Sequence, residues 1–124
     1  MRNRTRTLTD QELAIMKLVW EREQGATVRD VYEALLAKRK VAYTTVMTMM
    51  RILEQKGFLK KSQDERAFVY RPTQPKGQVI GAMVQEFINR VFNGAAEPLL
   101  VHLVEDHHLS PKDLEEIAKL RRKS

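Results

Sequence analysis

The sequence contains no cysteine. Disulfides, iron–sulfur clusters, thiolate zinc sites and cysteine nucleophiles are therefore excluded. It also lacks a run of about 18 consecutive apolar residues, so no membrane-spanning helix is expected, and its first residues do not have the pattern of a secretory signal. No glycine-rich loop suited to holding phosphates is present. We expect a cytoplasmic protein with no cofactor and no membrane partner.

Positive charge is concentrated in the first part of the chain. Residues 1–72 hold 15 Lys and Arg against 9 Asp and Glu, which accounts for the whole net charge of +6. Residues 73–124 hold 7 of each and are neutral. Three of the arginines lie in residues 1–8, where we expect a loose basic arm. A basic half beside a neutral half indicates a polyanion contact on one side and a different role on the other.

The basic half begins with two predicted helices. The first starts at a capping box, in which the side chains of Thr9 and Glu12 each bond the backbone N–H of the other residue. Thr27 is the expected N-cap of the second, with Asp30 three positions further on. The three cations of residues 38–40 are expected on the last turn of the second helix, where they would complement its dipole.

A third helix and a β-hairpin follow. The helix is predicted over residues 43–56, with Gly57 just beyond its end. The apolar period then becomes alternating, which predicts strands at 58–62 and 67–71 joined by a polar turn. The core of this half is expected to consist of Leu13, Met16, Val31, Leu35, Val46, Met50, Leu53, Phe68 and Tyr70.

Three helices followed by a hairpin are the order of a winged helix-turn-helix, whose third helix enters the DNA major groove. The outward face of that helix carries threonines and one Arg instead of the Glu/Lys pairs of an ordinary surface helix. Thr45, Thr48, Ile52 and Gln55 share one stripe, which suits contact with base edges and thymine methyls. We predict DNA contacts by Tyr43, Thr44, Thr45, Met47, Thr48, Arg51 and Gln55.

The hairpin supplies a second predicted contact. Four cations lie on or beside it, opposed only by Asp64 and Glu65. A wing of this kind lies along the phosphate backbone or in the adjacent minor groove. DNA contacts are therefore predicted for Lys60, Lys61 and Arg66.

The rest of the chain is predicted to be helical. Residues 73–77 form a linker, and breaks at 93–94 and 110–111 separate three helices. So short a segment cannot bury its many apolar side chains unaided, and it has no disulfide or metal to compensate. The predicted fold is mainly α with a small β-hairpin: a DNA-binding domain at 1–72 and a helical homodimerisation domain at 73–124. The predicted dimer contacts are Ile80, Val84, Phe87, Val91, Leu100 and Leu103.

Six stretches of the sequence carry a resemblance to a known family: LAIMKLVW (13–20), TVRDVYEAL (27–35), AYTTVMTMM (42–50), KGFL (56–59), LVHLVE (100–105) and LSPKDLEE (109–116). They resemble the penicillinase-repressor family, the last two its dimerisation half. The resemblance implies a homodimer that binds an inverted-repeat operator in double-stranded DNA and represses β-lactam-resistance or other stress genes. It also implies an inducing protease, which in this family cuts within the dimerisation half.

The chain departs from the family pattern at three points. The copper-responsive branch carries C-terminal cysteines, which are absent here. The Asn–Phe bond that is cut in penicillinase repressors aligns with His102-Leu103. Finally, the Arg usual at position 52 is replaced by Ile52, while Arg51 lies one residue earlier and points about 100° away around the helix. We therefore expect a different operator preference.

Three alternatives remain on sequence grounds. An enzyme would have to use His102, His107 and His108 with the neighbouring acids 105–106, which do not form a nucleophile–base motif. A winged-helix protein-interaction module would bind DNA only weakly and without sequence preference. A lipid-lying helix over 80–91 would need a basic polar face, but Arg90 is opposed there by Glu86.

Overall fold

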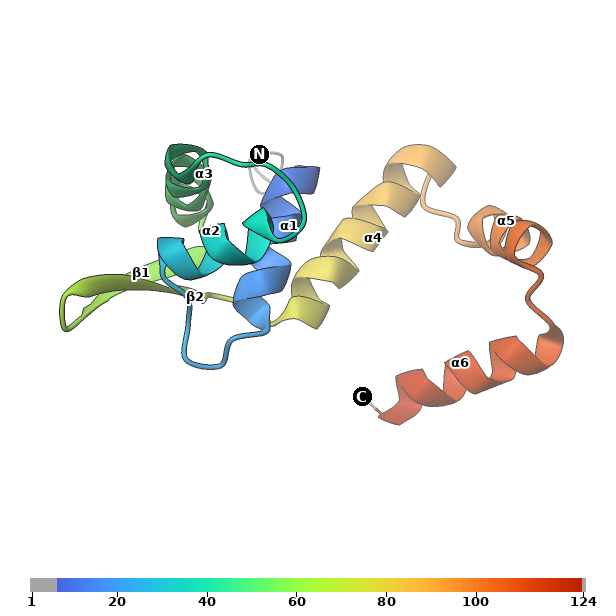
Figure 1. Cartoon of the computed structure of the whole chain (residues 1–124). Helices are drawn as coiled ribbons and strands as arrows, with labels where there is room; N and C mark the ends of the chain where they lie inside the picture. Colours follow the sequence, from blue (N-terminus) through green and yellow to red (C-terminus); the bar gives the residue numbers. More distant parts are fainter. Residues whose placement is uncertain (1–6, 124) are drawn as a thin grey trace. The chain divides into compact units, whose positions relative to one another are not determined.

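The computed structural model describes residues 7–123 (Figure 1). The chain forms two compact units, the first ending at Ile80 and the second beginning at Gly81. The fold is mainly helical with one antiparallel hairpin, as predicted. Most of the predicted basic arm, residues 1–6, lies outside the described residues. Leu8, at the end of that segment, is buried in the core of the first unit.

Helices α1 (Asp10–Trp20) and α2 (Val28–Leu36) begin after the predicted N-caps Thr9 and Thr27, and both N-caps form capping boxes. At α1 the Thr9 hydroxyl accepts the Glu12 N–H at 3.2 Å, and Glu12 Oε1 accepts the Thr9 N–H at 2.9 Å. The α2 box has both hydrogen bonds at 3.0 Å. These pairs satisfy backbone donors that a helix leaves open in its first turn.

The cations of residues 38–40 do not lie on the last turn of α2, so that prediction was wrong. The helix ends at Leu36, and the N–H groups of Lys38 and Arg39 both bond the carbonyl of Leu35, at 2.9 and 3.0 Å. This closes a tight turn after the helix. The cations therefore belong to the turn that leads into the next helix.

Helix α3 (Tyr43–Gln55) is followed by the hairpin of β1 (Leu59–Asp64) and β2 (Ala67–Pro72). Gly57 has φ of 91°, which suits the residue just after a helix end. The strands pair from Leu59 with Pro72 to Asp64 with Ala67, which leaves a two-residue turn. The hairpin is thus longer than predicted and its turn is shorter.

The hairpin is joined to the helices through the segment between α1 and α2. Ala26 and Tyr70 exchange two backbone hydrogen bonds, of 3.0 and 2.8 Å. Gly25 precedes this bridge with φ of 89°, and a Cβ there would lie 2.5 Å from Val69 Cγ1. Only glycine meets both demands, because it tolerates positive φ and lets β2 approach closely.

The core of the first unit contains most of the predicted residues. Its largest fully buried side chains are Ile15, Met16, Val19, Val31, Val46, Met50 and Leu53. Leu13 is only half-buried, and Phe68 is 51% exposed, so the sequence analysis was wrong to place Phe68 in the core. Phe68 alternates correctly with buried Tyr70, but it lies one pair from the hairpin turn, opposite Gln63.

The predicted linker is packed against the first unit. The Trp20 indole N–H donates to the Gln74 carbonyl at 3.0 Å, and the Thr73 hydroxyl donates to the Gly57 carbonyl at 2.6 Å. Helix α4 (Lys76–Phe92) begins directly afterwards, and Val79 on its first turn is buried. The compact unit therefore extends eight residues past the expected boundary at 72, to Ile80.

The second unit contains most of α4, with α5 (Glu97–His107) and α6 (Pro111–Lys123). As predicted, α4 ends before Asn93-Gly94, and Ser110 caps α6 together with Asp113. Of the side chains described from Gly81 to Leu120, none is buried. Apolar side chains in this unit are thus left in contact with solvent.

Substitution of Gly25 is expected to be costly. Gly25→Ala adds a methyl that overlaps Val69 and forces an L side chain to positive φ, so we expect the unfolding free energy to fall by about 2–4 kcal/mol. Gly81→Ala is the matched control, because apart from the adjoining residues and the local backbone of α4 no atom lies within 4 Å of its added Cβ. That change should stabilise the chain by about 0.5–1 kcal/mol. Equal urea-denaturation midpoints for the two variants would contradict the requirement for glycine at position 25.

Candidate nucleic-acid interface

Helix α3 is oriented by its buried face and by an ion pair at its end. Val46, Met50 and Leu53 are fully buried against the other helices. Beyond the last turn, Lys56 Nζ lies 2.9 and 3.1 Å from the two carboxylate oxygens of Glu12. Glu12 is only 5% exposed, so the charge is desolvated and paired. The outward face of α3 is therefore fixed relative to α1.

Opposing effects act on the pKa of the Glu12 carboxyl. Burial raises the pKa, but the hydrogen bond from Lys56, the backbone hydrogen bond from Thr9 and the positive charge of Lys56 outweigh it and lower the pKa below its usual value. Glu12 thus stays ionised in the folded protein. It holds the start of α1 and the end of α3 together at neutral pH.

The exposed face of α3 carries most of the side chains predicted to contact DNA. Thr44, Thr45, Thr48, Arg51 and Gln55 are exposed. They offer hydroxyl, amide and guanidinium groups of the kind that bond base edges and phosphates.

Other predicted residues on α3 lie at the edges of this face. Met47 and Ile52 are half-buried, so Ile52 contributes less to the outward stripe than predicted. Tyr43 is 39% exposed, and its ring meets Tyr32 edge-on with centroids 5.3 Å apart. The Arg29 guanidinium lies 5.9 Å from the Tyr43 ring centroid. Tyr43 thus connects the start of α3 with α2.

The wing presents the three predicted cations, Lys60, Lys61 and Arg66, and all are exposed. Lys61 Nζ lies 4.6 Å from the centroid of the Phe68 ring and 4.0 Å from Glu54 Oε1 on α3. These contacts connect the wing to α3 along one flank of the helix. The wing and the helix therefore present their polar groups as neighbouring surfaces.

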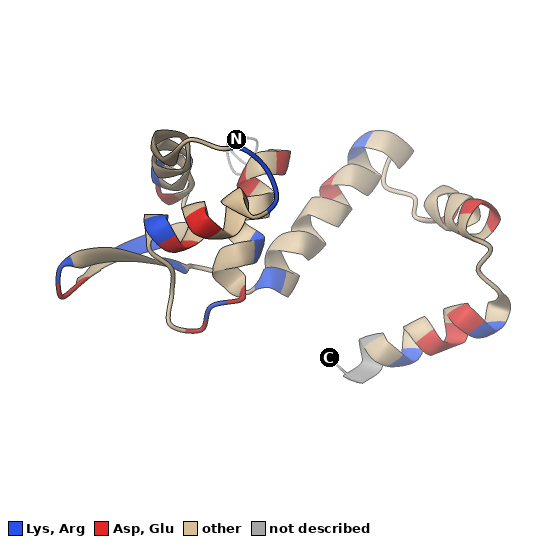
Figure 2. Cartoon of the chain, in the orientation of Figure 1, with Lys and Arg blue, Asp and Glu red and all other residues tan. Residues whose placement is uncertain are grey.

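A second group of cations was missed as a candidate site by sequence reasoning. Figure 2 shows Lys and Arg along the hairpin and also in the turn between α2 and α3. All three cations of this turn, residues 38–40, are exposed. The sequence signal was present, but it was assigned to a helix end. Whether these cations lie on the last turn of α2 or in the turn after it depends only on where α2 ends.

The histidines of the second unit do not gather into a site within residues 7–123. No three His, Asp or Glu side chains there lie close enough to hold a metal ion. His102 Nδ1 lies 3.8 Å from Asp106 on the next turn of α5, with both side chains mostly exposed. Among the described helices, none has the length and apolarity to cross a bilayer.

The chain has a helix-turn-helix, a polar exposed face on α3 and a basic wing. Together these features define a winged-helix transcriptional regulator. A solved structure of the DNA-binding domain of the repressor BlaI has this fold, with a TM-score of 0.52 and 28% identity over 58% of this chain and 87% of that one. MepR, a transcription regulator of the Staphylococcus aureus multidrug efflux pump MepA, shares the fold at a TM-score of 0.53 and 21% identity. That match covers 98% of this chain and 79% of MepR.

Sequence comparison identifies the family. Residues 8–123 match the penicillinase repressor family. The transcriptional regulator BlaI of Mycobacterium tuberculosis H37Rv is 39% identical over 99 residues, which are 79% of this chain and 72% of that protein. The penicillinase repressor of Bacillus licheniformis is 26% identical over 113 residues, 91% and 88% of the two chains. The chain belongs to the penicillinase repressor family and is a transcriptional repressor.

The Glu12–Lys56 pair predicts a pH-dependent contribution to stability. Glu12→Gln should lower the unfolding free energy by about 1.5–3 kcal/mol at pH 7, since it removes the charge that Lys56 contacts. A carboxyl with a lowered pKa stabilises the fold above its unfolded pKa, and this stability is lost as pH falls through the folded value. The difference between wild type and variant should therefore narrow below the usual pKa of 4.5.

Glu33→Gln is the control for this measurement. Glu33 pairs with Arg29 at 3.4 Å, but both side chains are more than 60% exposed. Its substitution should change stability by no more than about 0.5 kcal/mol. Equal effects of the two substitutions at pH 7, by urea denaturation, would exclude a special role for Glu12.

Proposed function

We propose that α3 contacts base edges in the major groove of an operator. The observation that carries this proposal is the exposed row of Thr44, Thr48, Arg51 and Gln55 on a helix whose opposite face is buried. Helices of a helix-turn-helix fit the major groove, where each base pair has its own pattern of donors and acceptors. Thr45, Met47 and Tyr43 lie at the borders of this row and complete the proposed contact.

The wing is proposed to bind the phosphate backbone beside α3. Lys60, Lys61 and Arg66 are exposed on one short hairpin. Phosphate contacts set the position of a protein on the duplex but carry no direct sequence information. The wing therefore supports affinity, and α3 supports sequence preference.

The second unit is proposed to form a homodimer. Its apolar side chains have no core of their own: Val84, Phe87 and Val91 are 39–49% exposed on α4, and Leu100 is 46% exposed on α5. Ile80 and Leu103 are half-buried. A second copy of the chain supplies the missing apolar surface, and two-fold symmetry then favours an inverted-repeat operator.

The regulated genes are proposed from the relatives. The penicillinase repressor of Bacillus licheniformis and the methicillin resistance regulatory protein MecI of Staphylococcus aureus are named for β-lactam resistance, and MecI is 24% identical over 123 residues. We propose control of β-lactam-resistance or other stress genes, from the cytoplasm and without catalytic activity. An inducing protease is a further proposed partner, with the His102-Leu103 bond on α5 at the aligned position.

Substitutions on α3 should reduce sequence discrimination. Arg51→Ala and Thr48→Ala are each expected to weaken binding to a duplex selected from a randomised library by about 1–3 kcal/mol, with a smaller effect on unrelated DNA. Lys17→Ala, an exposed cation on α1, is the control. Unchanged discrimination in both α3 variants, measured by fluorescence anisotropy, would exclude α3 as the base-contacting element.

Substitutions on the wing should reduce affinity for all sequences alike. Arg66→Ala and Lys60→Ala are expected to lower the slope of log affinity against log salt by up to about 0.9 for each phosphate that the variant no longer neutralises. Discrimination between selected and unrelated duplexes should stay as in the wild type. A wild-type salt slope in both variants would assign these cations to solvent.

Disruption of the apolar stripe should dissociate the dimer. Phe87→Asp places a charge among side chains that the partner would cover, so sedimentation should show a monomer with weaker operator binding. Gln85→Asp is the matched control, since Gln85 is exposed on the same helix, off the stripe. A monomeric wild type with undiminished operator binding would refute dimerisation, and weak binding without preference would favour a protein-interaction module.

A further inference from the structure

The turn between α2 and α3 holds three exposed cations, residues 38–40, that no acidic side chain of residues 7–123 compensates. Arg39 and Lys40 are exposed, and within that range neither side chain has a hydrogen bond or an acidic partner within ion-pair distance. Some cations of this unit are compensated, as Lys56 is by Glu12 and Lys61 by Glu54. The positive charge of the turn is therefore available to an external anion.

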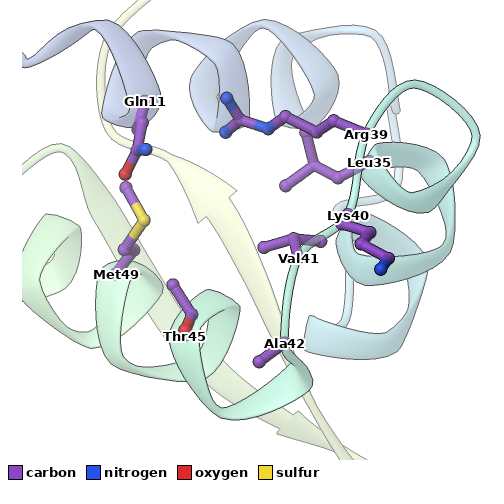
Figure 3. A pocket seen from close by; sticks show the side chains of 8 residues that line it. All are labelled: Gln11, Leu35, Arg39, Lys40, Val41, Ala42, Thr45 and Met49. Carbon is purple, nitrogen blue, oxygen red and sulfur yellow. The ribbon is translucent and has the colours of Figure 1, made fainter.

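A cavity of about 310 Å³ lies beside these cations (Figure 3). Figure 3 shows Gln11, Thr45 and Met49 on one side of it and Leu35, Val41 and Ala42 on the other. Its polar lining consists of Gln11, Arg39, Lys40 and Thr45, all of which can donate hydrogen bonds. No acidic side chain of the described part of the chain lines it. The chemistry of this lining is that of an anion site.

The cavity and the wing lie on opposite flanks of α3. Thr45 lines the cavity, whereas Glu54, nine residues later, contacts Lys61 of the wing at 4.0 Å. At about 100° per residue, these two positions are on opposite sides of the helix. The exposed residues Thr48 and Arg51 lie between them. A helix in the major groove has one phosphate backbone along each flank, so the two cationic groups suit the two strands.

We propose that this cavity receives a backbone phosphate of the DNA strand opposite the wing, held by Arg39 and Lys40 with the Thr45 hydroxyl. The inference rests on the proposed function, because it requires α3 in the major groove. It replaces the base contact proposed above for Thr45 with a phosphate contact, and leaves the base contacts to the row of Thr44, Thr48, Arg51 and Gln55. Thr45→Ala should therefore weaken binding equally for all sequences, unlike Thr48→Ala.

The test compares Arg39→Gln/Lys40→Gln with Lys38→Gln in the full-length protein. Lys38 is an exposed neighbour in the same turn that does not line the cavity, so it is a matched control for charge. Affinity for a duplex that the wild type selects from a randomised library is measured over a range of salt. The double variant should lower the salt slope by about 0.9 for each phosphate it no longer neutralises, and Lys38→Gln should lower it far less. Thermal unfolding of each variant confirms that it is folded.

Replacing single phosphates by neutral analogues identifies the phosphate that the cavity contacts. Single methylphosphonates in the same duplex should weaken wild-type binding at one phosphate per half-site on the strand away from the wing. At that phosphate the double variant should show no further weakening, because substitutions that remove the same contact are not additive. Additive effects at every phosphate, or equal salt slopes for the double variant and Lys38→Gln, would overturn the inference.

Two further outcomes separate this inference from its alternatives. Calorimetric binding of inorganic phosphate that the double variant abolishes, together with an unchanged DNA salt slope, would show a site for a free anion and overturn the inference. A wild-type protein that selects no duplex would overturn the proposed function and this inference together. Selective binding by the wild type with an unaffected double variant would overturn this inference alone.

Discussion

The ion pair between Glu12 and Lys56 is the constraint on which the proposed DNA-contacting surface depends. One carboxylate serves two purposes, since it completes the capping box of α1 and accepts the ammonium of Lys56 just after α3. Its burial would favour the protonated acid, but these partners keep it charged. The pair therefore holds both the start of the first helix and the end of the third, which fixes the face of α3 that is exposed to solvent.

The division of apolar burial sets the division of roles between the two units. Every buried hydrophobic side chain among the described residues lies at or before Val79. The first unit thus has a complete core, closed by the packed segment at Gln74 and the first turn of α4. The second unit has regular helices but no buried side chain among those described. A stable helix with an unburied apolar stripe requires a partner, which makes self-association the simplest account of this half.

Local sequence rules predicted the elements well because each depends on few neighbouring residues. The N-caps at Thr9 and Thr27 and the α4 stop at Asn93-Gly94 need only contacts within the same turn. The outward face of α3 followed from helical period alone. The resemblance to the penicillinase-repressor family extended the prediction to nearly the whole chain, and the match of residues 8–123 to that family confirms it.

The sequence-based predictions were wrong where tertiary contacts decide the position of a residue. Phe68 has the alternating spacing of a core residue in its strand. This spacing does not indicate how far the helices extend beneath the hairpin, and so whether they cover Phe68. Residues 73–77 have the composition of a linker, yet the indole of Trp20, more than fifty residues earlier, holds Gln74 in place. The cations at 38–40 suited a helix end, and the early end of α2 places two of them at a cavity instead.

We propose that two copies of α3 contact base edges in successive major grooves. The most direct measurement replaces single purines of a selected duplex by 7-deaza analogues, which remove the N7 acceptor from the major groove. Affinity is expected to fall at two clusters of positions related by two-fold symmetry, about 10 base pairs or a multiple apart. Inosine in place of guanine, which alters the minor groove, should have little effect within those clusters. If only the minor-groove substitution lowers affinity, or if neither substitution does, α3 does not contact base edges in the major groove.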